Sequence, residues 1–148
     1  MDILSNFSET LAELISMHST NTVKLEEQTN IDCTSFSKYL NKKVIPTLPY
    51  AIAIADLFGC SLDYLFGLTN EYKKRTYLSC QPFFQSFQEI LKSHNCTRYR
   101  ISKDLGIHNN TLTDWFYGRR IPSIDSLIKI SEYFGCSLDE LVGRKASE

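Results

Sequence analysis

The sequence predicts an all-α fold of two tandem five-helix domains, joined by a short linker that is helical or otherwise ordered. The chain repeats itself: an offset of 76 positions aligns residues 7–67 with residues 83–143 without a gap, and both copies contain Phe-Gly-Cys-Ser-Leu-Asp. Within each copy, apolar residues recur three and four positions apart, as on one face of a helix. No stretch alternates as a β-strand would. We therefore expect a first domain at 1–68, a linker at 69–82 and a second domain at 83–144.

The first helix of each copy is marked by its apolar spacing. The residues are Leu11, Leu14 and Ile15 in the first copy and Phe87, Ile90 and Leu91 in the second. In the first copy, Asn6 and Glu9 are placed as a capping box, in which two side chains satisfy unpaired amides at a helix start. We therefore expect that helix to begin just after Asn6.

A second and a third helix follow, separated by a tight turn. The second helix is predicted to begin after the N-cap residue Asn21 or Thr97 and to end at residue 29 or 105. The turn covers residues 30–32 or 106–108. It begins with Asn30 or Gly106, and both residue types tolerate the left-handed backbone that such a turn needs. The third helix is predicted over residues 33–40 and 109–117.

Capping residues also delimit the fourth and fifth helices. They recur in both copies: Thr47 and Ser123 before the fourth helix, Gly59 and Gly135 after it, and Ser61 and Ser137 before the fifth. Ser and Thr side chains accept hydrogen bonds from the unpaired amides at a helix start. Gly at a helix end adopts the left-handed backbone readily. In the second copy, Ser137 and Glu140 form a predicted capping box.

Charge is unevenly distributed, although the whole chain has a net charge of −1. Residues 7–68 hold four Lys against seven acidic residues, whereas residues 83–144 hold eight Lys and Arg against seven acidic residues. The linker adds a net charge of +2. The second copy and the linker therefore carry the basic side of the molecule.

The five cysteines indicate a reduced, cytoplasmic protein. They are odd in number and include no CxxC pair, which disfavours both a disulfide framework and a zinc site. Cys60 and Cys136 occupy the same position in the two copies, where a small apolar side chain would pack. No apolar run is long enough to cross a membrane, and no basic-then-apolar leader is present. The sequence indicates no metal, cofactor or small-molecule ligand.

A helix, a three-residue turn and a second helix with no strand nearby make up the helix-turn-helix arrangement. Residues 101–115 read Ile-Ser-Lys-Asp-Leu-Gly-Ile-His-Asn-Asn-Thr-Leu-Thr-Asp-Trp and resemble the core of the phage Cro/repressor (XRE) helix-turn-helix family. Residues 118–123 also resemble that family, and residues 134–143 are similar to its last two helices. The resemblance covers nearly all of residues 83–143, and residues 7–67 through the repeat. It implies two tandem repressor-like domains whose partner is double-stranded DNA.

The start of the third helix is the predicted DNA-reading surface of the second domain, because a helix in the major groove presents its first turn to base edges. Ile107, Leu112 and Trp115 are the expected inward anchors. The expected outward residues are His108, Asn109, Asn110, Thr113 and Asp114. Asn can pair with adenine, Asp can accept from cytosine, and Thr can contact the thymine methyl group. The resemblance implies base-reading positions at Asn109 and Asn110.

Three arginines of the second domain are predicted phosphate contacts. The resemblance places Arg98 where the family's phosphate-contacting Gln usually stands. Arg119 and Arg120 follow the third helix, where they would flank the DNA backbone. The alternative is that all these polar residues belong to an ordinary solvated face.

The first domain departs from the family pattern. Its candidate DNA-binding residues are Thr22, Cys33, Thr34, Ser37, Lys38, Lys42 and Lys43. Asn30 replaces the family's turn glycine, and Lys42 replaces the glycine after the third helix. Glu26, Glu27 and Asp32 would repel the duplex. Two interpretations stay open: this domain reads a divergent half-site, or it is a packing partner for the second domain.

Other residue patterns predict no catalysis. No glycine-rich phosphate loop, HxxxH pair or Ser/His/Asp set with meaningful spacing is present, so we expect no enzyme. His18 and His94 both end a first helix, where a cation favours the helix dipole. Six aromatic residues around the linker are expected to pack between the domains or in a homodimer: Tyr64, Phe66, Tyr72, Tyr77, Phe83 and Phe84.

Two functions follow. The leading hypothesis is a sequence-specific, repressor-like transcriptional regulator in which a tandem chain supplies two covalently linked DNA readers. The alternative is a protein-interaction module, similar to an antitoxin or an anti-repressor, that has the same fold and binds DNA weakly.

Overall fold

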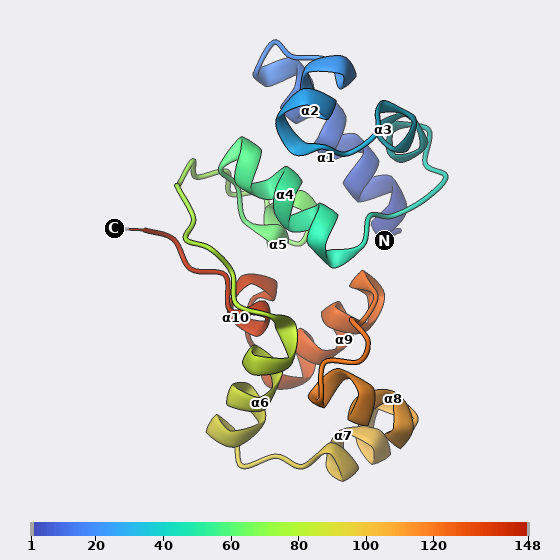
Figure 1. Cartoon of the computed structure of the whole chain (residues 1–148), viewed down its shortest axis with the longest axis vertical. Helices are drawn as coiled ribbons and strands as arrows, with labels where there is room; N and C mark the ends of the chain where they lie inside the picture. The colour runs from blue at the N-terminus through green and yellow to red at the C-terminus, as the bar shows by residue number, and fades with distance from the viewer. Residues whose placement is uncertain (1, 148) are drawn as a thin grey trace. The chain divides into compact units, whose positions relative to one another are not determined.

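The computed structural model describes residues 2–147, and the regular structure of these residues is helical (Figure 1). In chain order the helices are α1 (Ile3–Met17), α2 (Thr22–Thr29), α3 (Cys33–Leu40), α4 (Leu48–Phe58), α5 (Leu62–Leu65), α6 (Phe83–Ser93), α7 (Arg98–Leu105), α8 (Asn109–Phe116), α9 (Ile124–Phe134) and α10 (Leu138–Val142). Within residues 2–147 there is no strand, only an isolated antiparallel bridge between Tyr77 and Ala146. The all-α prediction is confirmed. No helix in this range has the length and hydropathy needed to span a membrane.

The chain divides into two compact units, Met1–Thr76 (unit 1) and Tyr77–Glu148 (unit 2). Unit 1 contains α1 to α5 and unit 2 contains α6 to α10. The finer limits expected from the sequence, 1–68, 69–82 and 83–144, stay a prediction, and residue 1 lies outside the described residues.

Three helices of unit 1 begin and end at positions that match those of unit 2. The limits of α2 and α7, of α3 and α8, and of α4 and α9 differ by 76 residues at both ends, the offset of the sequence repeat. Local chemistry explains the boundaries. Asn21 and Thr97 each accept a hydrogen bond from an amide in the first turn of the helix that follows, at 3.0 and 3.1 Å. Ser61 and Ser137 do the same for α5 and α10.

Residues with left-handed backbone also occur at positions 76 residues apart, even where unit 1 has another residue in place of glycine. Asn30 and Gly106 end α2 and α7 with φ of 61° and 70°. After α3 and α8, Lys42 and Gly118 have φ of 59° and 78°. Side chains with a Cβ rarely adopt this conformation. The same turns therefore form in unit 1 although it lacks two of the glycines.

Two sequence predictions of helix ends were wrong, and one predicted cap does not form. Helix α1 begins at Ile3 because Asp2 caps it, accepting from the Leu4 amide at 3.2 Å, so Asn6 and Glu9 do not form the predicted start. Helix α4 begins after Thr47 as predicted, but the Thr47 side chain makes no capping hydrogen bond. Helix α8 ends at Phe116, one residue early.

Each unit has its own apolar core. In unit 1 the rings of Tyr39 and Phe66 lie 5.4 and 5.3 Å from that of Phe7, and all three residues are buried. In unit 2 the Phe87 ring lies against Phe83 and Trp115, which are also buried. Further side chains with no exposed surface complete the cores: Leu11, Leu25, Phe36 and Ile54 in unit 1, and Ile101, Leu112, Ile130 and Leu141 in unit 2.

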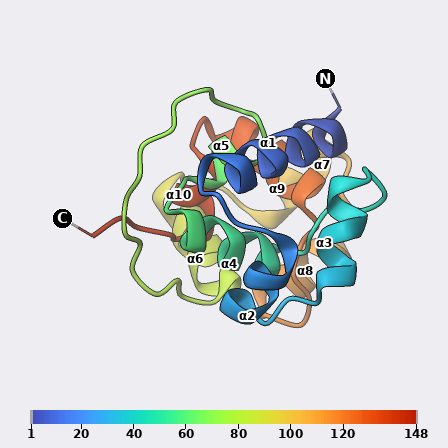
Figure 2. The ribbon, with the colours of Figure 1, turned by 90° about the horizontal axis from the view of Figure 1, so that it is seen from above.

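Residues 68–82 contain no helix, so the predicted linker is ordered but not helical (Figure 2). The amide of Arg75 donates to the Gly59 carbonyl, and the Tyr72 hydroxyl donates to the Phe58 carbonyl, both at 2.8 Å. Further along, the amide of Leu78 donates to the Lys145 carbonyl at 2.9 Å. These bonds to other segments replace the local bonds that a helix would need. The first part of the linker thus packs on unit 1 and the last part on unit 2.

The linker aromatics are engaged within their own units. Phe66 and Phe83 are buried in the two cores, and Tyr64 lies 5.2 Å from Tyr72 between ring centroids. The guanidinium of Arg144 stacks on the Tyr77 ring at 3.5 Å.

Candidate nucleic-acid interface

Unit 2 presents a helix-turn-helix formed by α7, residues 106–108 and α8. Buried side chains hold the two helices to the unit: Ile101 and Leu112 have no exposed surface, and Trp115 is 4% exposed. Ile107 in the turn is half-buried. The residues expected to face inward therefore do so, and they fix which face of α8 points to solvent.

The first turn of α8 is polar and exposed. His108, Asn109 and Asn110 are all exposed. The Nδ1 atom of His108 accepts a hydrogen bond from the Asn110 amide at 3.1 Å, so this histidine is the N-cap of α8. When Nδ1 accepts, a neutral imidazole carries its proton on Nε2 and presents a donor there. The two asparagine side chains offer both donors and acceptors beside it.

Arg98 is held across α8 by contacts that the sequence did not predict. Its Nη1 atom donates to the Thr113 hydroxyl at 3.3 Å, and its guanidinium lies 4.3 Å from the Phe116 ring centroid and 5.4 Å from that of Tyr117. The Thr113 hydroxyl donates in turn to the Asn109 carbonyl at 2.9 Å. Because a guanidinium has five N–H donors, this arrangement orients Arg98 and still leaves donors for a phosphate.

Asp114 pairs with Arg119 at the end of α8. Their side chains lie 3.5 Å apart, and the Arg119 amide donates to the Asp114 carbonyl at 2.8 Å. The guanidinium of Arg119 also lies 5.3 Å from the Tyr117 ring centroid. Arg120 follows and is exposed. This ion pair offsets the negative charge that Asp114 would otherwise bring to a DNA surface.

Two exposed aromatic side chains of the helix-turn-helix were missed by the sequence analysis, and one of them, Tyr117, belongs to this face. Tyr99 in α7 is 70% exposed and Tyr117 after α8 is 55% exposed. Tyr117 contacts both Arg98 and Arg119. Arg98 and Tyr117 are far apart in the chain, so no local spacing could have indicated their contact.

In unit 1 the corresponding surface is acidic at the start of α3. The Glu26 carboxylate accepts a hydrogen bond from the Cys33 amide at 2.9 Å, and Asp32 accepts from the Thr34 amide at 3.1 Å. The Glu26 charge raises the pKa of the Cys33 thiol, with burial and Asp32 adding to the effect. The two carboxylates thus occupy the place where α3 would meet an anion.

The remaining candidates of unit 1 lie at its surface. Thr34, Ser37, Lys38, Lys42 and Lys43 are exposed, and Thr22 is half-buried. The Lys42 ammonium lies 3.6 Å from the Glu9 carboxylate. Unit 1 has a threonine where unit 2 has Arg98, and so has no equivalent of the stacked arginine.

Most of unit 2 matches a known protein family. Residues 87–141 match the family model described as helix-turn-helix. The matched residues include α7, the turn and α8. The match runs from α6 to α10 and agrees with the resemblance seen at residues 101–115. No curated protein and no solved structure matched the chain.

Proposed function

We propose that this chain is a sequence-specific, repressor-like regulator of transcription that binds double-stranded DNA with unit 2. The observation that carries the proposal is the match at residues 87–141, combined with an exposed polar first turn on α8. In helix-turn-helix proteins this turn of the second helix meets base edges in the major groove.

The contacts around α8 suggest separate roles for its residues. Asn109 and Asn110 are exposed and can each make a bidentate pair with adenine. The Thr113 hydroxyl is used inside the unit, so its methyl group is the part that would meet a thymine methyl. Asp114 acts chiefly by orienting Arg119. His108 caps the helix and offers a donor.

Arg98, Arg119 and Arg120 are the proposed phosphate contacts. Phosphate contacts position a protein on the duplex, whereas base contacts give specificity. Two of these guanidinium groups stack on Tyr117, which limits their motion before DNA arrives. Such preorganisation reduces the entropy lost on binding.

We propose that unit 1 is a second, weaker domain of the same kind. Its helices match those of unit 2 in order, and α2 to α4 also match in their limits, but Glu26 and Asp32 stand at the start of α3. Their charges oppose a phosphate backbone. Whether unit 1 reads a divergent half-site is one of the outcomes that the following experiment separates.

The test is selection from a randomised duplex pool at low salt, followed by fluorescence-anisotropy titration of the enriched site. We expect an enriched motif that is lost in Asn109→Ala/Asn110→Ala. Each bidentate pair contributes about 1–3 kcal/mol of discrimination. Cys33→Ala/Thr34→Ala, at the same positions of unit 1, is the matched control, and relaxation of one half-site in it would show that unit 1 also reads. A pool without enrichment would exclude the regulator.

A protein-interaction module of the antitoxin or anti-repressor kind is the second candidate. The acidic start of α3 favours it, because this surface suits a basic protein better than DNA. It would show as a stable complex with a protein and weak DNA binding without sequence preference. Homodimerisation through the linker aromatics also stays a prediction, which sedimentation velocity of the full chain checks.

A further inference from the structure

The two units share a Phe-Gly-Cys turn and a histidine at the end of their fourth helix, covered in unit 1 and uncovered in unit 2, although Glu140 stands in unit 2 where Tyr64 packs on Tyr72 in unit 1. Phe58-Gly59-Cys60 follows α4 into its turn, and Phe134-Gly135-Cys136 does so for α9. In each unit a histidine ring packs on the phenylalanine. The ring centroids of His18 and Phe58 lie 5.0 Å apart, and those of His94 and Phe134 lie 4.8 Å apart.

In unit 1 this surface binds a segment of the chain's own linker. The Tyr72 hydroxyl donates to the Phe58 carbonyl at 2.8 Å and lies 3.3 Å from Nε2 of His18. Three residues later, the Arg75 amide donates to the Gly59 carbonyl at 2.8 Å. The segment passes so close that a Cβ on Gly59 would lie 2.8 Å from the Arg75 carbonyl oxygen.

In unit 2 the equivalent surface is exposed. Phe58 is 1% exposed and Gly59 is buried, whereas Phe134 is half-exposed and Gly135 is exposed. His94 is exposed too. A Cβ on Gly135 would meet no atom within 4 Å among the described residues. The space that the linker fills in unit 1 is therefore open in unit 2.

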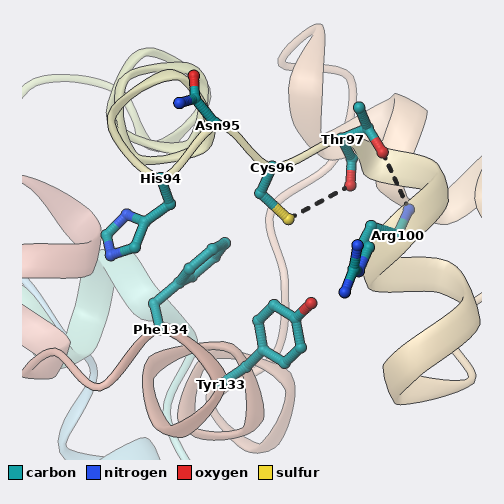
Figure 3. Close-up of a pocket in the computed structure, with 7 residues that line it drawn as sticks. All are labelled: His94, Asn95, Cys96, Thr97, Arg100, Tyr133 and Phe134. Carbon is teal, nitrogen blue, oxygen red and sulfur yellow. Dashed lines mark hydrogen bonds between the residues drawn. The ribbon is translucent and has the colours of Figure 1, made fainter.

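A cavity adjoins this surface. Figure 3 shows the His94 and Phe134 side chains side by side at its wall, with Tyr133 and Arg100 further along. Its volume is about 490 Å³. An exposed aromatic ring beside a cavity of this size offers apolar area to a bound side chain.

Charges of both signs lie near the open surface: Arg100 lines the cavity, and two glutamates lie close to Gly135 in the sequence. Glu132 and Glu140, which precede and follow Gly135 in the chain, are both exposed. The segment bound in unit 1 is basic, because Tyr72 is followed by Lys73, Lys74 and Arg75. Unit 1 already holds residues 72–75, so we assign the site of unit 2 to a similar segment of a partner protein.

We propose that His94, Phe134 and Gly135 form a docking site for an extended, basic, tyrosine-bearing segment of a partner protein. The tyrosine hydroxyl donates to the Phe134 carbonyl, and the amide three residues later donates to the Gly135 carbonyl. Recognition combines main-chain hydrogen bonds with one aromatic anchor. The site shares no residue with the α8 surface, and its existence does not depend on DNA binding.

The probe is a synthetic peptide of residues 69–76, Thr-Asn-Glu-Tyr-Lys-Lys-Arg-Thr, titrated into the isotopically labelled full chain and followed by NMR. We expect saturable shifts at His94, Phe134 and Gly135. The matched peptide with Tyr72→Ala should bind at least tenfold more weakly. Equal affinity of the two peptides would mean that charge attraction alone holds the peptide, and would overturn the proposal. Chemical shift changes confined to unit 1 would also overturn it.

The variant Gly135→Asn tests the docking site while leaving the fold of unit 2 intact. Asn tolerates the left-handed backbone of Gly135 (φ 67°) better than other side chains, so the turn should form. Its Cβ would lie in the path of the peptide backbone, as a Cβ on Gly59 would in unit 1. We expect at least a tenfold loss of peptide affinity with an unchanged spectrum elsewhere. Full affinity in a folded Gly135→Asn chain would rule out the proposed mode, and so would the absence of shifts in the wild-type chain at millimolar peptide.

Discussion

Cys33 shows how one carboxylate sets the chemistry of a helix start. Glu26 accepts from the Cys33 amide, and its charge is the largest cause of the raised thiol pKa. Since the thiolate is the nucleophile, Cys33 should react slowly. Glu26→Gln removes the charge and lowers the pKa, so more thiolate forms. We expect faster alkylation of Cys33 by iodoacetamide at mildly alkaline pH, measured by mass spectrometry with Cys96 as the internal reference. Unchanged or slower alkylation would contradict this.

Substitution of Arg98 tests whether side-chain shape or charge matters at the proposed DNA surface. Its guanidinium stacks on Phe116 and Tyr117. Arg98→Lys keeps the charge, but a lysine cannot stack in the same way. We expect two- to fivefold weaker binding to the selected duplex by anisotropy, because a cation–π contact contributes about 0.5–1 kcal/mol at an exposed site. Arg120→Lys is the control, since Arg120 is exposed and should tolerate the change. Equal effects of the two variants would show that charge alone matters.

At the scale of single elements, the turns after α3 and α8 each contain a residue with left-handed backbone. A substitution is expected to stabilise the first turn, and the matched substitution to destabilise the second. Lys42 has φ of 59°, which costs a residue with a Cβ about 1–2 kcal/mol. Lys42→Gly relieves this strain and loses only an exposed ion pair with Glu9. We expect unit 1 to gain about 1 kcal/mol of stability, measured by hydrogen exchange of buried amides in α1 and α3.

Gly118→Ala is the matched change in unit 2. Its backbone has φ of 78°, and the new Cβ would lie 2.8 Å from Cδ1 of Phe84. Strain and crowding together should cost about 2 kcal/mol. Urea unfolding followed by the fluorescence of Trp115, the one tryptophan of the chain, reports on this unit. A neutral effect of Gly118→Ala together with a destabilising Lys42→Gly would refute the argument from backbone conformation.

The helix limits that the sequence predicted correctly depend on residues close together in the chain. The limits of α2, α3 and α7 followed from N-caps such as Asn21 and Thr97 and from the residue types that tolerate the following turn. The Thr47 side chain makes no capping hydrogen bond, although α4 begins where predicted. Of the two states expected for the linker, helical or otherwise ordered, the second forms because Tyr72 and Arg75 bond to carbonyls at the end of α4. The stacking of Arg98 on Tyr117 was missed for the same reason, since contacts between distant positions leave no periodic signal.

For the whole molecule, charge distinguishes the two units. Unit 1 holds seven Lys and Arg against nine acidic residues, a net charge of −2, and unit 2 holds nine against eight, a net charge of +1. The carboxylates of Glu26 and Asp32 lie at the start of α3, whereas α8 begins with neutral side chains. If only unit 2 binds DNA, few phosphates are neutralised. If unit 1 also binds, the number is larger, so counting the neutralised phosphates distinguishes the two cases.

Salt dependence measures that number. Each neutralised phosphate adds about −0.9 to the slope of log K against log salt concentration. If Arg98, Arg119 and Arg120 are the contacts, the slope for the full chain should be about −3. Lys42→Ala/Lys43→Ala should leave it unchanged, because Lys42 already faces Glu9. Arg119→Ala/Arg120→Ala should reduce it to about −1. A slope near −5 in the wild-type chain, falling to about −3 in Lys42→Ala/Lys43→Ala, would instead show that unit 1 lies on the duplex beside unit 2.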